Sequence, residues 1–263
     1  MKHLFFLRMV MMLSVISSFT SVFADSVTQN WIEANYQKQE FMIPMRDGVR
    51  LYTAVYSPRK ISDSPLLLMR TPYSCGNYGS DYEKIANNYM CEYLQKGYIY
   101  VKQDVRGRFR SEGVFEHIKP VYSKLRENGV DEATDVYDTV EWLLNNLSGH
   151  NGRVGILGNS YSGFYALMGG LSDHPAIKAI SPQAPVVDWF VGDDFHQNGA
   201  LKLIDAFHFH NSFGKPHYGP TERYPATVRH YTTDEYSFFL QKGPLPEISS
   251  LLGDSISFWP DMM

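Results

Sequence analysis

A single serine occupies the position expected of a nucleophile in acyl-transfer chemistry. Residues 154–163 read VGILGNSYSG, an apolar run that leads directly into Ser160. A serine on a sharp strand-to-helix turn is exposed at the end of a sheet, and small neighbours let the strand and the helix approach closely. Gly158, Ser162 and Gly163 meet that need, although the strict pentapeptide has glycine at position 162. The alternative is an ordinary strand, turn and helix with an incidental serine.

Such a serine needs a base that removes its proton and donors that stabilise the oxyanion. The backbone N–H of Tyr161, at the start of the following helix, is expected to be the first donor. A second donor is expected from the loop 70–73, which reads RTPY and follows a short apolar run.

Short apolar segments predict the sheet that positions these residues. Residues 41–56 read as a β-hairpin, because Asp47-Gly48 between two apolar runs favours a tight turn with positive φ. Three almost wholly apolar runs, typical of parallel strands that are buried on both faces, follow at 66–69, 98–101 and 154–157.

Helical segments separate the later strands. In 132–147 the apolar residues recur on one helical face, and Asp131 is placed to cap the N-terminus. Further elements are expected at 164–171, a helix, and at 176–180, a strand. Strand, helix and strand in this order predict a right-handed βαβ unit. The fold class is therefore α/β, of the α/β-hydrolase type, with a mostly parallel sheet and flanking helices.

The chain ends and the composition restrict the other classes of function. Charged residues precede an uncharged run, 9–23, which ends in the cleavage pattern VFA at 22–24. Residues 1–24 are therefore predicted to be a signal peptide that is cut after Ala24. The protein is then expected to be periplasmic or secreted, without a stable membrane anchor. The net charge is −4 with no run of Lys or Arg, which argues against nucleic acid. No cofactor or metal is expected. Whether Cys75 and Cys91 pair is left open.

Five ordered motifs resemble one family of serine hydrolases. They are MRDGV at 45–49, RTPY at 70–73, DVRGR at 104–108, SEG at 111–113 and GNSYSG at 158–163. In order and spacing they are similar to the cocaine esterase, α-amino-acid ester hydrolase and X-Pro dipeptidyl-peptidase family. Residues 184–194 most resemble the α-amino-acid ester hydrolases and the glutaryl-cephalosporin acylases.

The resemblance implies a role for four residues. Ser160 is the nucleophile, Tyr161 the backbone oxyanion donor and Tyr73 a second donor through its phenol. Asp194 corresponds to one of the carboxylates that receive the α-ammonium group of the substrate. Two alternatives stay open: Tyr73 as a core tyrosine whose hydroxyl is satisfied, and Asp194 as a helix cap. The substrates implied are small esters, amides or short peptides, and a homo-oligomer of the full-length form is left open.

Residues 25–188 are expected to form the N-terminal part of the hydrolase domain, and 189–263 the aromatic-rich beginning of a helical cap. In the family the catalytic acid and histidine lie beyond the length of this chain and precede a β-sandwich domain. We therefore expect a truncated chain that is inactive alone, with His196, His208, His210, His217 and His230 in the cap-like stretch. The alternatives are an X-Pro dipeptidyl-peptidase-like exopeptidase and a non-catalytic remnant. His208 and His210 suggest a metal site, but without a third ligand they are read as cap residues.

Overall fold

The structure is a computed structural model. It describes residues 30–60, 63–76, 78–80, 82, 85, 88–125, 128–188, 195–215, 217, 219–225, 232, 234–252, 256 and 259. The predicted signal peptide, 1–24, lies outside these residues, as do Asp194 and His230.

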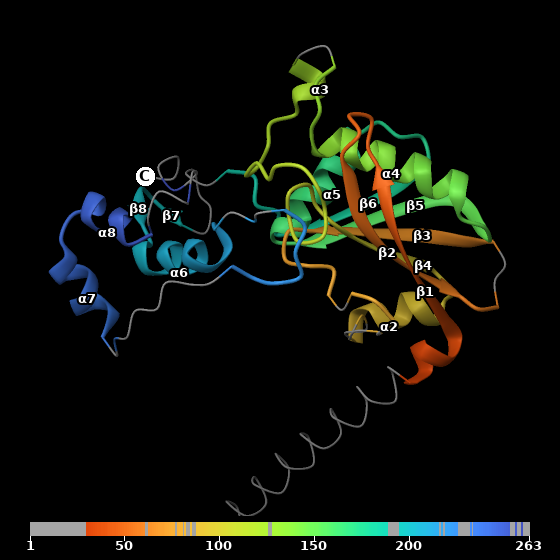
Figure 1. Cartoon of the computed structure of the whole chain (residues 1–263), viewed down its shortest axis with the longest axis horizontal. Helices are drawn as coiled ribbons and strands as arrows, with labels where there is room; N and C mark the ends of the chain where they lie inside the picture. The colour runs from red at the N-terminus through yellow and green to blue at the C-terminus, as the bar shows by residue number, and fades with distance from the viewer. Residues whose placement is uncertain are drawn as a thin grey trace, which may run out of the picture.

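Six strands form one mixed sheet, shown in Figure 1. Their spatial order is β1-β2-β4-β3-β5-β6. The hairpin of β1 and β2 is antiparallel, and β2 pairs antiparallel with β4, whereas β4, β3, β5 and β6 run parallel. The bounds are β1 Tyr36–Pro44, β2 Arg50–Pro58, β3 Ser64–Thr71, β4 Ile99–Asp104, β5 His150–Asn159 and β6 Ile177–Gln183. The predicted hairpin and the three parallel strands are confirmed.

Helices cover both faces of the sheet, which explains why the central strands β3 and β4 are buried along most of their length. Successive side chains of a strand point to opposite faces. Accordingly, Leu66 and Leu68 pack with helix α4 (Glu132–Asn146), while Leu67 packs with helix α2 (Asn88–Gln95). Figure 1 shows α2 on one side of the sheet, with α4 and α5 (Tyr161–Leu171) on the other.

The predicted crossover helix α4 begins where its cap was expected. Asp131 accepts a hydrogen bond from the N–H of Thr134 at 2.8 Å, and the Thr134 hydroxyl accepts one from the N–H of Asp131 at 2.9 Å. This reciprocal capping box satisfies two backbone donors that the helix cannot satisfy itself.

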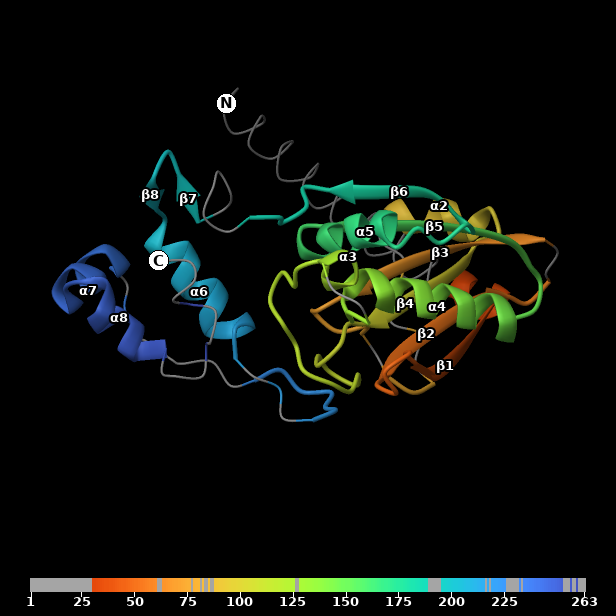
Figure 2. The same ribbon diagram turned by 90° about the horizontal axis from the view of Figure 1, so that it is seen from above.

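The chain after β6 forms short helices beside the sheet. They are α6 (Leu203–Phe213), α7 (Glu235–Lys242) and α8 (Leu245–Leu252), preceded by the two-residue strands β7 (His196–Gln197) and β8 (Ala200–Leu201). Their own apolar core contains Phe207, Phe239 and Trp259. Figure 2 shows these helices beyond the end of β5. The boundary between 188 and 189 remains a prediction. Among the described residues, no helix is long and apolar enough to cross a membrane.

A buried ion network anchors α4 to the carboxyl end of the sheet. The Arg70 guanidinium, fully buried at the end of β3, donates to Glu132 Oε2 at 2.8 Å and to Gln103 Oε1 at 2.7 Å. Arg106 lies in the turn after β4, and it donates to Asp135 Oδ1 at 2.7 Å and to Asp47 Oδ2 at 2.7 Å. The short helix α3 (Tyr122–Leu125) follows this turn later in the chain. The network therefore joins β3, β4 and the hairpin turn to the first turn of α4.

Arg70→Met is expected to lower the free energy of unfolding by about 3–5 kcal/mol, because it leaves the Glu132 carboxylate buried without its cation. Urea denaturation measures the change. Arg46→Met is the matched control, since the half-exposed Arg46 pairs with Asp138 at 2.7 Å. Exposed pairs contribute about 0–1 kcal/mol. Equal effects of the two substitutions would contradict the assignment.

Candidate active site

Ser160 occupies a strained turn between β5 and α5. Its φ and ψ are 58° and −122°, a conformation that non-glycine residues rarely adopt. The Ser160 N–H donates to the carbonyl of Gln183 at 2.9 Å, and the Ser160 carbonyl accepts from the N–H of Gly163 at 2.9 Å. The backbone on both sides of the serine is therefore held, as the predicted nucleophile turn requires.

Two glycines make this turn sterically possible. A Cβ at Gly158 would lie 1.9 Å from the Ser162 carbonyl oxygen, and one at Gly163 would lie 2.7 Å from the Gln183 carbonyl oxygen. Both approaches are closer than a side chain allows. Ser162 is buried, and the close approach to β6 is made at position 163, which explains why the chain tolerates serine at 162.

Tyr161 is the first residue of α5, so its backbone N–H lies at the N-terminus of a helix, where anions are stabilised. Its buried phenol accepts a hydrogen bond from the N–H of Ile118 at 3.1 Å and lies 2.7 Å from His117 Nδ1. Burial, with smaller effects of His210 and Arg108, lowers the pKa of His117 to about 3. His117 is therefore neutral at pH 7.

Tyr73 lies next to Tyr161, two residues after the end of β3. The two rings meet edge to face with centroids 6.3 Å apart, and the ring of Phe213 from α6 lies 5.3 Å from that of Tyr73. The Tyr73 N–H donates to Thr71 Oγ1 at 3.0 Å, and the Tyr73 carbonyl accepts from the Tyr224 hydroxyl. Ser160, Tyr161 and Tyr73 thus follow the carboxyl ends of the neighbouring parallel strands β5 and β3. Asp194 is not among the described residues.

The loop that carries Tyr73 is also attached to the end of β4. Asp104 accepts hydrogen bonds from the N–H of Cys75 at 2.6 Å and from the Tyr78 hydroxyl at 2.9 Å. Burial raises the pKa of the Asp104 carboxyl to about 6. No disulfide joins Cys75 to Cys91. The motif residues around Asp104 therefore support the site structurally, and Arg106 does so through its ion pairs.

Among the described residues, none donates to or accepts from the Ser160 hydroxyl. A general base works best when its pKa is near the working pH. Burial lowers the pKa of His210 to about 3 and that of His217 to about 4. Exposed His208 pairs with Glu235 at 2.6 Å, and His196 lies in β7. These histidines do not form a recognisable base for Ser160.

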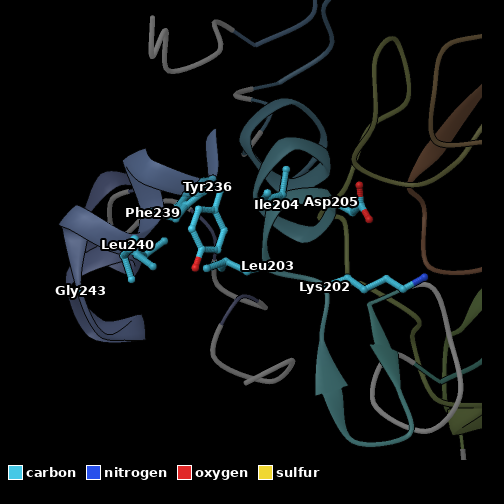
Figure 3. A pocket seen from close by; sticks show the side chains of 9 residues that line it. Lys202, Leu203, Ile204, Asp205, Tyr236, Phe239, Leu240 and Gly243 are labelled. Carbon is cyan, nitrogen blue, oxygen red and sulfur yellow. The ribbon is translucent and has the colours of Figure 1, made fainter. Parts of the chain in front are cut away.

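A pocket of about 700 Å³ lies among α6, α7 and α8. Figure 3 shows Leu203 and Ile204 on one side of it and Tyr236, Phe239 and Leu240 on the other. None of its lining residues belongs to the turn around Ser160 or to the Tyr73 loop. The pocket is therefore separate from the candidate active site.

Three residues that contact the site were not predicted from the sequence. His117 contacts the Tyr161 phenol, and Arg108 and Tyr224 donate to backbone carbonyls of the loop that carries Tyr73. Each lies in a loop and reaches the site only through tertiary contacts. The sequence carries no spacing signal that would have found His117 or Tyr224. Arg108 was visible only as part of the DVRGR motif.

Comparison with known proteins places this geometry in context. Residues 47–232 match the family described as X-Pro dipeptidyl-peptidase (S15 family). A cocaine esterase from Rhodococcus sp. (strain MB1 Bresler) is 33% identical over 174 residues, which cover 65% of this chain and 28% of that protein. The chain thus spans less than a third of the length of this relative.

Solved structures show the same relation. An aminopeptidase from a marine sediment archaeon, Thaumarchaeota archaeon, aligns with a TM-score of 0.77 and 33% identity over 87% of this chain and 38% of its own. An α-amino acid ester hydrolase aligns with a TM-score of 0.75 and 34% identity over 87% of this chain and 37% of its own.

Proposed function

The chain belongs to the X-Pro dipeptidyl-peptidase (S15) family of hydrolases, and on this premise we propose that the whole protein transfers the acyl group of an ester or amide to Ser160. The observation that carries the proposal is the positive φ of Ser160 between a buried strand and a helix. This geometry presents a serine hydroxyl at the end of a sheet.

Each step of the proposed reaction has a candidate residue. Ser160 Oγ attacks the carbonyl carbon, and its proton passes to a base. The Tyr161 N–H and the Tyr73 phenol donate to the oxyanion, and the leaving alcohol or amine takes the proton as the C–O or C–N bond breaks. Water then releases the acid from the acyl-serine. The rings of Tyr73 and Tyr161 meet edge to face, so the two proposed donors belong to residues that lie side by side.

The base and the carboxylate that would orient it are not identified among the described residues. We propose that the 263-residue polypeptide alone turns over little ester, because the described histidines include no recognisable base for the Ser160 hydroxyl, and burial holds the pKa values of His117, His210 and His217 well below neutrality. Enzymes that lose a member of the triad keep only about 10³- to 10⁴-fold catalysis over water, which comes from the oxyanion hole and substrate binding.

The substrate class proposed is an α-amino-acid ester or an acyl-peptide. Its ammonium group would bind Asp194, since a partly desolvated cation needs negative charge nearby. Similarity to an α-amino acid ester hydrolase supports this choice. An X-Pro dipeptidyl-peptidase-like activity is the second candidate, because the matched family is described by that reaction. The pattern of residues 1–24 supports the further proposal that the protein is exported.

A fluorophosphonate probe tests the proposed function. Two preparations are compared, the 263-residue chain and the same chain continued by the C-terminal region of the α-amino acid ester hydrolase. We expect the second to hydrolyse phenylglycine methyl ester and to carry the probe on Ser160 by peptide mass spectrometry, and the first to do neither at a comparable rate. Faster cleavage of an Xaa-Pro anilide would select the second candidate. Labelling at another residue would refute the nucleophile, whereas turnover by the first preparation would show that a local histidine completes the site.

A further inference from the structure

Arg108 is a buried cation whose ion pairing differs from that of its neighbours. Its side chain is 2% exposed. Arg70 and Arg106, equally near the carboxyl end of the sheet, bind the carboxylates of α4. Among the residues that the structure describes, no carboxylate lies within ion-pair distance of Arg108. Burial without such a partner lowers its pKa from the ordinary value, and it is costly for the fold.

The partners of Arg108 are two carbonyl oxygens and a set of aromatic rings. Nε donates to the carbonyl of Pro72 at 3.1 Å, and Nη1 donates to the carbonyl of Phe213 at 3.1 Å. The guanidinium carbon lies 4.5 Å from the ring centroid of Phe213 and 5.0 Å from that of Phe115, within the range of cation–π attraction. The cation is thus held between the loop after β3 and the last residue of α6.

Both residues that accept from Arg108 are in contact with Tyr73. Pro72 precedes Tyr73 in the chain, so its carbonyl lies in the same peptide unit as the Tyr73 N–H. That N–H donates to Thr71 Oγ1, and the Tyr73 carbonyl accepts from the Tyr224 hydroxyl. Phe213, whose carbonyl is the other partner of Arg108, packs its ring against that of Tyr73. Arg108 therefore acts on both the backbone and the ring environment of Tyr73.

We propose that Arg108 is a positioning residue, which fixes the Tyr73 phenol toward the oxyanion and couples its position to the end of α6. The inference rests on the proposed function, because it takes Tyr73 as an oxyanion donor. A guanidinium is required, since its planar fork reaches two separate carbonyls at once, whereas an ammonium on a flexible stem does not hold that geometry. A displacement of about 1 Å in a donor of this kind can cost about 10²-fold in rate.

Amide hydrogen exchange of the purified 263-residue chain tests the positioning role without requiring turnover. Arg108→Met is expected to speed exchange in 71–76 by about 5- to 10-fold, as the loss of one net hydrogen bond predicts, and to leave 150–159 unchanged. Arg108→Lys should fall between Arg108→Met and the unsubstituted chain. Arg50→Met is the control, because Arg50 pairs with Glu112 at the surface, and this substitution should leave exchange in both segments nearly unchanged. Unchanged exchange in 71–76, or equal acceleration in both segments, would overturn the proposal.

Kinetics of the preparation that hydrolyses phenylglycine methyl ester supply the second measurement. Arg108→Lys should lower kcat by about 10-fold or more and leave KM nearly unchanged, since a misplaced donor affects the transition state. In the Tyr73→Phe background the same substitution should have little further effect on kcat. Multiplied losses would mean that Arg108 acts independently of Tyr73 and would overturn the proposal. Loss of activity on Ser160→Ala tests the proposed function itself and leaves the exchange result untouched.

Discussion

Ser160→Ala is expected to abolish hydrolysis of phenylglycine methyl ester and labelling by a fluorophosphonate in the chain that is continued by the C-terminal region of the α-amino acid ester hydrolase. Loss of a triad serine costs about 10⁶-fold in kcat. The physical reason is that Oγ forms the covalent bond to the acyl carbon, and no neighbouring group replaces it. Ser160 is the residue directly after β5, and it is partly exposed.

Ser162→Ala is the matched control. Ser162 lies on the first turn of α5 but is buried, and its main contribution to the turn is the backbone that faces Gly158. The Ser162→Ala variant should keep nearly full activity and full labelling. Thermal denaturation of both variants should show that Ser160→Ala remains folded. Undiminished hydrolysis by Ser160→Ala would refute the assignment of the nucleophile.

The sequence predicted the elements that are defined locally. The strands at 66–69, 98–101 and 154–157 and the capped helix after Asp131 were found because burial on two faces and capping leave local patterns. The helix expected at 164–171 begins at Tyr161, because the turn around Ser160 leads directly into it. The strand expected at 176–180 extends to Gln183, since its last residues pair with β5 up to Asn159.

Long-range order was not predictable in the same way. Nothing in the apolar runs indicates that β3 lies between β4 and β5, because pairing depends on segments far apart in the chain. The residues of the candidate site also divide into those that a local pattern predicts and those that only tertiary packing brings together. Ser160 and Tyr161 lie in one local motif, and Tyr73 follows a parallel strand whose end must lie near theirs. Arg108, His117 and Tyr224 contribute through loops and α6, where only tertiary packing determines the contact.

Tyr73→Phe is the second large effect that we expect. The substitution removes the phenol oxygen and keeps the ring that packs on Tyr161 and Phe213. Loss of one oxyanion donor costs about 10²- to 10³-fold in kcat, and KM should change little because the bond strengthens in the transition state. Steady-state kinetics on phenylglycine methyl ester, with the same continued chain, measures both quantities.

The control for Tyr73→Phe must lose a phenol without touching the oxyanion. Tyr36→Phe meets this condition, because the Tyr36 hydroxyl donates to the carbonyl of Leu94 at 2.6 Å in the core beneath α2. This substitution should lower the free energy of unfolding and leave kcat nearly unchanged. If Tyr73→Phe behaved like Tyr36→Phe, with lower stability and unchanged kcat, Tyr73 would be a packing residue of the loop after β3. A fall in kcat with unchanged stability would instead require its hydroxyl to act in the transition state, since the backbone bonds that hold the loop do not involve that oxygen.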